Sequence, residues 1–211
     1  KQHLFASASV LHFGSISLIE SPAQESTKKA VEMARANKML VSYDPNVRIS
    51  LWPSKETCRK TILNTLSWAD VVKINEDELE FLTGSRDTSA AEKLREEHNV
   101  PLLIITLDSR GAYFVTKHGG KQVPGFQVEL VEATGAGDGF NSGVIAGLLP
   151  LIKGKADKRE ALLALEQTKL FEIIQAANAI GAITCTKAGA IPALPHRDEI
   201  DAFMAKMAVK S

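Results

Sequence analysis

Short apolar runs alternate with longer stretches of helical periodicity along most of the chain. One run, Leu102–Thr106, is apolar at nearly every position, which is typical of a strand buried on both faces. Strands that alternate with helices of this length predict an α/β fold with a parallel sheet covered on both faces and ligands at the carboxyl ends of its strands. The predicted strands are Val10–Phe13, Met39–Tyr43, Val71–Ile74, Leu102–Thr106, Ala112–Thr116 and Gln122–Val131.

Polar and turn-forming residues mark the expected ends of the helices. Ser21 is read as an N-cap with Pro22 at the first helical position, and Gln24 completes a capping box. Gly84 is expected to end a short helix, and His118–Lys121 to form a hairpin turn. The predicted helices are 22–37, 55–68 (capped by Ser54), Glu76–Thr83, Thr88–His98, Gly137–Leu149, Arg159–Thr186 and His196–Met207, with a polar linker at Lys153–Lys158.

Length and composition narrow the class of protein. At roughly 150 residues per domain, 211 residues predict a single domain. The 25 Lys and Arg residues balance 25 Asp and Glu residues, and this zero net charge argues against nucleic acid as a partner. A hydrophobic share of 45% supplies one sizeable core and excludes a disordered chain. The longest apolar run, Gly143–Ile152, is shorter than the roughly 18 residues of a membrane helix, so no membrane partner is expected.

The cysteines and histidines do not indicate a metal centre. Cys58 and Cys185 are too few for a disulfide scaffold or a cysteine zinc site, and we expect both to be buried, reduced thiols of a cytoplasmic protein. No signal-peptide pattern opens the chain, which begins at Lys1 without Met, so a processed or partial polypeptide is expected. The five histidines are scattered without ligand spacing, at His3, His12, His98, His118 and His196.

The segment Thr134–Phe140 (T-G-A-G-D-G-F) combines small residues with one carboxylate at the start of a predicted helix. Phe140 occupies the place of the third glycine of a dinucleotide fingerprint, and the chain has no P-loop pattern. Small residues let the backbone approach a ligand, and the first N–H groups of a helix lack partners, so the segment predicts an anion site. Asp138 fits such a site if it takes a proton from a hydroxyl that attacks a bound phosphoryl group; the alternative is a Gly-rich turn with Asp138 as an ordinary N-cap.

This segment resembles the second signature of the ribokinase-like (PfkB) sugar kinases, D-T-x-G-A-G-D. Other pieces follow in the family's order, and D-P-N-x-R followed by L-W-P-S is most similar to the fructokinase branch. The resemblance covers essentially the whole chain and implies a three-layer αβα, doubly wound, mostly parallel fold as one domain over residues 1–211. The matching pieces are Asp44–Arg48, Leu51–Pro53, Lys73–Leu79, Thr106–Gly111, Asn178 and Lys187–Ala190.

The resemblance also implies what is missing from this sequence. The family's N-terminal third, which normally supplies a β-lid and much of the sugar pocket, is expected to be absent. A homodimer of the complete protein would form through that lid. The residues that choose the sugar are expected to lie mainly in the same missing portion.

The resemblance assigns roles to the Gly-rich segment and to one arginine. Asp138 would be the catalytic base for the sugar hydroxyl, and Gly135, Ala136 and Gly137 would hold the γ-phosphoryl group through their N–H groups. Arg48 would face the transferred phosphoryl group or the sugar, whereas the ordinary alternative is a solvated loop arginine.

Further resemblances concern Mg²⁺ and ATP. Asn75 and Glu78 match the family's N-x-x-E motif, which helps to place Mg²⁺ and phosphate through water. The ordinary alternative for these two residues is an acidic helix start stabilised by the helix dipole. The residues implied to bind the nucleotide are Thr106, Asp108, Gly111, Asn178 and Gly189.

The sequence departs from the family pattern at three positions. Glu132 and Ala133 stand where Asp and Thr are usual, in a region whose backbone commonly helps to hold a monovalent cation, which counts against K⁺ as a further cofactor. Asp108 replaces the first glycine of T-L-G-x-x-G, and a carboxylate there would repel the triphosphate unless it points away or meets the metal.

The leading interpretation is an ATP-dependent phosphotransferase with an alcohol acceptor, a fructokinase that phosphorylates the 6-hydroxyl of D-fructose. A related reading keeps the mechanism and changes the sugar to 2-keto-3-deoxygluconate or a riboside. A reading of another class is a member that binds nucleotide without turnover. The three departures favour this last reading, and Asp138 disfavours it.

Overall fold

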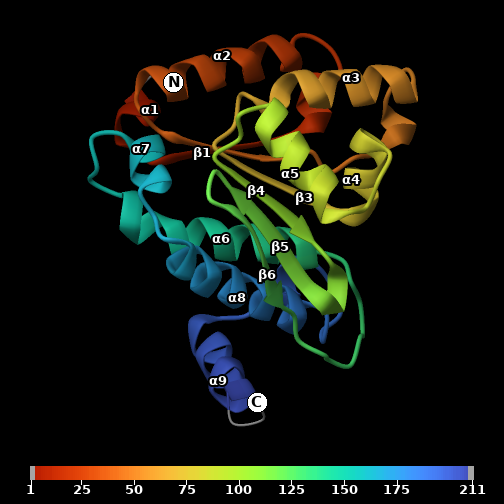
Figure 1. Ribbon diagram of the computed structural model, residues 1–211, viewed down its shortest axis with the longest axis vertical. Helices are drawn as coiled ribbons and strands as arrows, with labels where there is room; N and C mark the ends of the chain where they lie inside the picture. Colours follow the sequence, from red (N-terminus) through yellow and green to blue (C-terminus); the bar gives the residue numbers. More distant parts are fainter. Residues whose placement is uncertain (1–2, 209–211) are drawn as a thin grey trace. The chain divides into compact units, whose positions relative to one another are not determined.

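Six strands form one sheet in the computed structural model, which describes residues 3–208 (Figure 1). Neighbours in the sheet follow the chain order, β1-β2-β3-β4-β5-β6. The first four strands run parallel, as the sequence predicts, and β5 returns directly into β6. The strands are β1 (Val10–Gly14), β2 (Leu40–Asp44), β3 (Val71–Asn75), β4 (Leu102–Thr106), β5 (Gly111–Thr116) and β6 (Gly119–Pro124).

The inner strands carry the core of the sheet. Every residue of β2 is buried, as are the first four residues of β3 and of β4, so these strands are covered on both faces. This confirms the prediction for Leu102–Thr106. The two edge strands are more exposed: only Phe13 of β1 and Val123 of β6 are buried. The ring of Phe13 stacks on Tyr43 of the neighbouring strand at 4.3 Å between centroids.

Four helices connect the parallel strands. Crossovers between parallel strands are right-handed in nearly all proteins, so connections between successive neighbours place their helices on one face of the sheet (Figure 1). Contacts of α2 with β1 and β2, and of α4 and α5 with β4, agree with this arrangement. The helices of this part of the chain are α1 (His3–Ser7), α2 (Ala23–Ala36), α3 (Lys55–Leu66), α4 (Glu76–Thr83) and α5 (Thr88–Glu97).

The remaining helices are α6 (Ala136–Ile152), α7 (Lys158–Leu163), α8 (Gln167–Thr184) and α9 (Arg197–Ala208). Glycines at a spacing of four residues face α8 from α6. A Cβ at Gly143 would lie 2.9 Å from the Ala177 Cα, and one at Gly147 would lie 2.7 Å from the Ile173 Cγ2. The two helices are therefore in close contact.

The chain divides into two compact units. Unit 1 comprises Lys1–Thr106, Tyr113–Lys121 and Leu151–Ala164, and unit 2 comprises Leu107–Ala112, Gln122–Pro150 and Leu165–Ser211. Unit 1 holds most of the sheet with α2 to α5 and α7, and unit 2 holds α6, α8 and α9. None of the helices within residues 3–208 is long and apolar enough to cross a membrane.

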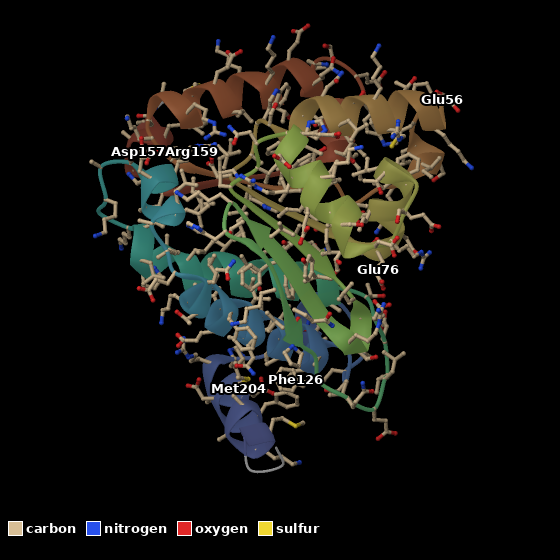
Figure 2. All side chains as sticks on the ribbon, in the orientation of Figure 1. Glu56, Glu76, Phe126, Asp157, Arg159 and Met204 are labelled. Carbon is tan, nitrogen blue, oxygen red and sulfur yellow. The ribbon has the colours of Figure 1, made fainter. Side chains whose placement is uncertain are left out.

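A buried carboxylate, Asp70, ties three segments of unit 1 together. One carboxylate oxygen pairs with Arg35 of α2 at 2.7 Å and with Arg159 of α7, and the other accepts the Val41 N–H at 2.8 Å. Figure 2 shows Arg159 near the start of α7, beside Asp157, whose side chain caps that helix. The arginine pairs join α2 and α7 to the loop that enters β3.

The predicted start of the second helix is wrong. Pro22, not Ser21, occupies the N-cap of α2, and no side chain caps the helix. The Ser21 hydroxyl instead donates to the Glu25 carboxylate at 3.0 Å, and the Gln24 amide donates to the Leu18 carbonyl at 3.0 Å. Both polar side chains are engaged elsewhere, so no capping box forms.

The predicted hairpin is displaced toward the N-terminus. Its turn lies at Lys117 and His118, and the returning strand begins at Gly119 and ends at Pro124 rather than at Val131. Proline has no N–H group to donate to a neighbouring strand, which favours an end to the ladder there. The chain beyond it, 125–131, is irregular.

The single long helix predicted at Arg159–Thr186 is two helices. Ala164 ends α7, and the extended backbone of Glu166 (φ −69°, ψ 149°) precedes α8. No proline or glycine marks this break, which explains why the pattern suggests one helix. Of the two cysteines expected to be buried, Cys58 is buried and Cys185 is half-buried at the end of α8.

Candidate active site

The parallel strands of unit 1 end in a row of polar residues. Asp44, Asn75 and Thr106 are the last residues of β2, β3 and β4. Asn75 is the direct partner of Thr106 in the register of β3 with β4, and Asp44 is the partner of Gly14 in β1. The structure thus brings two predicted site residues, Asn75 and Thr106, side by side at the carboxyl ends of the strands, where α/β proteins bind ligands.

Asn75 and Glu78 form a capping box at the start of α4. The Asn75 Oδ1 accepts the Glu78 N–H at 2.8 Å, and the Glu78 Oε2 accepts the Asn75 N–H at 2.9 Å. The other carboxylate oxygen of Glu78 accepts the Val47 N–H at 2.7 Å. Glu78 is buried, and this burial raises the pKa of its carboxyl group although its backbone hydrogen bonds lower it.

These contacts bear on both interpretations of the N-x-x-E motif. The first turn of α4 is acidic, as the ordinary alternative expects, but the Glu78 carboxylate also reaches out of its own helix to the loop after β2. Both of its oxygens already accept backbone N–H groups. A role toward Mg²⁺ therefore stays a prediction, and it would run through water, as the resemblance implies.

The loop after β2 carries Arg48 and is anchored by two carboxylates. Asn46 has a positive φ of 46°, and its N–H donates to the Asp44 Oδ1 at 3.1 Å. The next N–H, of Val47, is the one held by Glu78. Arg48 is exposed, and its guanidinium donates to the Val47 carbonyl at 3.1 Å. The arginine thus projects from a loop whose backbone is fixed at two successive N–H groups.

Sequence reasoning missed one charged residue of this cluster. Lys73 lies in the middle of β3, is 7% exposed, and its Nζ lies 3.3 Å from the Asp44 Oδ2. The available signal is a lysine inside V-V-K-I-N, a run that is otherwise apolar up to its last residue. Buried lysines are nearly always paired, so such a lysine predicts a buried carboxylate close by.

In unit 2, the Gly-rich segment leads into the first turn of α6, as predicted. Gly135 has a positive φ of 84°, and the helix begins at Ala136, whose N–H donates to the Ala133 carbonyl at 3.2 Å. Within residues 3–208, the N–H groups of Gly135, Gly137 and Asp138 have no acceptor. They are unpaired donors at the positive end of a helix dipole, which is the arrangement of an anion site.

Asp138 lies in this first turn and is exposed. Its carboxylate accepts no hydrogen bond and forms no ion pair with another residue of the range 3–208. An N-cap carboxylate would accept a backbone N–H two or three residues later. The N-cap alternative therefore does not describe Asp138, whose carboxylate has no partner within residues 3–208.

A hydrogen bond between distant residues holds the loop before α6. The Glu132 carboxylate accepts the Gly189 N–H at 2.8 Å, and this bond and the Thr134 hydroxyl lower the pKa of Glu132. A Cβ at Gly135 would lie 3.0 Å from the Ala190 Cα, so the two loops are in direct contact. Glu132, a departure from the family pattern, thereby ties Gly189 to the Gly-rich segment.

Two further predicted nucleotide residues, Gly111 and Asn178, also lie close together within unit 2. Gly111 has a φ of 98°, and a Cβ there would collide with the backbone of Val123, Pro124 and Gly125. The buried Asn178 side chain donates to the carbonyls of Val123 at 3.3 Å and Pro124 at 3.1 Å. Asn178 of α8 and Gly111 thus both contact the backbone of residues 123–125.

Asp108 adopts the left-handed conformation, with a φ of 51°. The family pattern has glycine at this position, and Asp108 adopts backbone angles that glycine takes up more readily than aspartate does. Burial raises the pKa of the Cys185 thiol most, and the negative charge of Asp108 raises it further. No group of three or more His, Cys, Asp or Glu side chains able to hold a metal ion occurs in residues 3–208.

Comparison with known proteins decides the family. The family model described as pfkB family carbohydrate kinase matches residues 1–197. The chain belongs to this pfkB family. It is 42% identical over 199 residues to a protein named probable fructokinase-4 from Arabidopsis thaliana, covering 94% of this chain and 58% of that relative.

Solved structures of pfkB kinases share the fold. A doubly substituted fructokinase from Vibrio cholerae O395, in its fructose, ADP and potassium bound form, superposes with a TM-score of 0.79 at 32% identity, over 92% of this chain and 59% of its own. Aminoimidazole riboside kinase from Salmonella enterica, complexed with aminoimidazole riboside and an ATP analogue, gives 0.78 at 30% identity, over 92% and 62%. The ribokinase-like αβα fold is thereby confirmed, and the chain spans about three fifths of the length of these proteins.

Proposed function

We propose that the protein is an ATP-dependent sugar kinase that transfers the γ-phosphoryl group to the 6-hydroxyl of D-fructose. The observation that carries the proposal is the start of α6, where unpaired backbone N–H groups accompany an exposed, unbonded Asp138 carboxylate. This pairing fits phosphoryl transfer, in which the protein supplies charge stabilisation and a proton acceptor. Membership of the pfkB family and the similarity to fructokinases support it.

In this mechanism the sugar hydroxyl loses its proton to Asp138 as its oxygen attacks the γ-phosphorus of ATP, and the bond from that phosphorus to the β–γ bridging oxygen breaks, so that ADP leaves. The N–H groups of Gly135 and Gly137 donate to the phosphoryl oxygens, where negative charge accumulates. The Ala136 N–H is engaged by Ala133, so the Asp138 N–H takes its place in the anion site. Arg48 is proposed to face the phosphoryl group or the sugar.

ATP supplies the phosphoryl group, and Mg²⁺ neutralises its oxygens when bound. The backbone donors at α6 fit the phosphates. Thr106, Asp108, Gly111, Asn178 and Gly189 are proposed to form the nucleotide site, with Asn75 and Glu78 placing the metal through water.

A coupled ADP-release assay across a panel of sugars tests the proposal. We expect turnover with D-fructose to exceed turnover with D-ribose, 2-keto-3-deoxygluconate and aminoimidazole riboside, and phosphorus NMR of the product should show a 6-phosphate. Turnover with a riboside alone would favour the second candidate, a riboside kinase with the same mechanism. The similarity to aminoimidazole riboside kinase supports that candidate. Nucleotide binding without turnover on any sugar would contradict both candidates and support a non-catalytic member.

Replacing Asp108 by glycine is expected to tighten ATP binding about fivefold. A carboxylate near the phosphates costs on the order of 1 kcal/mol, which is somewhat less than a tenfold change in affinity. The backbone of Asp108 already has the angles of a glycine (φ 51°), so the substitution requires no change of the loop conformation. Isothermal titration with ATP, with and without Mg²⁺, measures the change.

Asn99→Gly is the matched control, because Asn99 also has a positive φ (49°) and lies in unit 1, after α5. It should leave the affinity for ATP unchanged. Weaker binding of ATP to Asp108→Gly only when Mg²⁺ is present would mean that Asp108 meets the metal. Equal affinities under both conditions would mean that the Asp108 carboxylate points away from the phosphates.

A further inference from the structure

Unit 1 contains a buried cluster of three charged side chains, Asp44, Lys73 and Glu78, that the proposed mechanism does not use as a whole. Their exposed fractions are 5%, 7% and 6%. They come from β2, β3 and the first turn of α4, at the carboxyl ends of the strands. Buried charges are expensive unless they are paired, so such a cluster needs a reason beyond stability.

The contacts of the cluster converge on the backbone just before Arg48. The Asp44 carboxylate has Lys73 on one oxygen at 3.3 Å and the Asn46 N–H on the other at 3.1 Å. Glu78 holds the next N–H, of Val47, at 2.7 Å. Two successive N–H groups of the loop are therefore fixed by carboxylates.

Val47 transmits this constraint to Arg48. Its N–H donates to Glu78, and its carbonyl accepts the Arg48 guanidinium at 3.1 Å. Arg48 itself is exposed, and no carboxylate within residues 3–208 pairs with its guanidinium. The backbone to which it is bonded thus decides where this side chain can project.

Lys73 is the single cation among the three. Its charge acts on Glu78 as well as on Asp44: burial raises the pKa of Glu78 most, Asp44 raises it further, and Lys73 lowers it. Without Lys73, the buried Asp44 carboxylate would lose its ion pair, and the carboxylate that holds the Asn46 N–H would no longer be fixed in place by a cation.

We propose that Lys73 is a positioning residue that keeps Asp44 and Glu78 bonded to the backbone of loop 45–48 and so fixes Arg48 for phosphoryl transfer. The kinetic part of this inference rests on the proposed kinase function. Lys73→Met, which keeps the length of the side chain and removes the charge, should lower kcat about 10- to 100-fold, the size of effect that a misplacement of about 1 Å produces. The KM for ATP should change less than kcat.

A double-mutant cycle separates positioning from a general loss of structure. If Lys73 acts through Arg48, adding Lys73→Met to Arg48→Ala should lower kcat little further, because coupled residues are not additive. Multiplicative effects of the two substitutions would overturn the proposal. Thr65→Val is the control: Thr65 is a buried polar residue of α3, so its loss should lower the Tm and leave kcat unchanged.

Amide hydrogen exchange tests the tether without any assay of activity. In the wild-type protein the Val47 amide should exchange slowly, and in Lys73→Met it should exchange at least tenfold faster while the Tyr43 amide in β2 keeps its rate. If Lys73→Met does not fold, Lys73→Arg keeps the charge and should retain slow exchange at Val47. Fast exchange at Val47 in the wild type would overturn the proposal, whereas absence of sugar phosphorylation alone would overturn only the kinase function.

Discussion

Asp138→Asn is expected to lower kcat by about 10²–10⁴-fold, the usual contribution of a general base. The amide of asparagine has nearly the same shape as the carboxylate but cannot accept the hydroxyl proton. Because the Asp138 carboxylate is exposed and has no partner in residues 3–208, its replacement breaks no contact of the fold. The Tm and the affinity for ATP should stay close to those of the wild type. Steady-state kinetics and calorimetry measure both.

The matched control for this substitution is Asp198→Asn. Asp198 is also an exposed aspartate in the first turn of a helix, α9, so the same favourable interaction with the helix dipole is lost. Its kcat should equal that of the wild type. A near-normal kcat for Asp138→Asn would show that Asp138 is not the base, and the mechanism proposed above would then be wrong.

Asp70→Ala should lower the free energy of unfolding by about 3 kcal/mol. Removal of one partner from a buried ion pair costs about 3–5 kcal/mol, and the lower end applies because Arg35 and Arg159 are 32% and 27% exposed and can turn to water. The buried Val41 N–H also loses its acceptor. For a chain of this size the Tm should fall by about 6–12 °C.

Urea unfolding and thermal melts measure this effect, and Asp77→Ala controls for it. Asp77 also pairs with an arginine, Arg86, but its side chain is 79% exposed, so its removal should change stability by less than about 1 kcal/mol. Equal losses for the two variants would contradict the role of Asp70 as the common partner of α2 and α7. The kinetics of Asp70→Ala below its Tm should resemble the wild type, since its side chain contacts α2, α7 and the Val41 N–H near the start of β2, at the opposite end of that strand from Asp44.

Local signals predicted the elements that depend on neighbouring residues. The bounds of β4 follow from a continuous apolar run, and those of α4 from Asn75 at its start and Gly84, with a φ of 82°, at its end. The break between α7 and α8 could not be predicted, because no proline or glycine marks it and no side chain caps the start of α8 at Glu166.

The same distinction holds for the site. The Gly-rich segment and the N-x-x-E motif are each contiguous; the first is indicated by its own residues and the second by the resemblance to the family. The pairing of Lys73 with Asp44 joins residues 29 positions apart, and the bond from Gly189 to Glu132 joins residues 57 positions apart. Glu132 departs from the family motif, and the motif alone does not predict that its carboxylate accepts the Gly189 N–H. Contacts of this kind depend on the packing of strands and loops that no local pattern contains.

The division of the chain also bears on how such a protein can change in evolution. Each unit is assembled from three separate stretches of sequence, and Leu151–Ala164 returns to unit 1 after most of α6 has been built in unit 2. A single insertion, deletion or recombination event in the gene acts on one contiguous stretch. A single contiguous deletion or exchange in the gene therefore cannot remove or replace either unit whole.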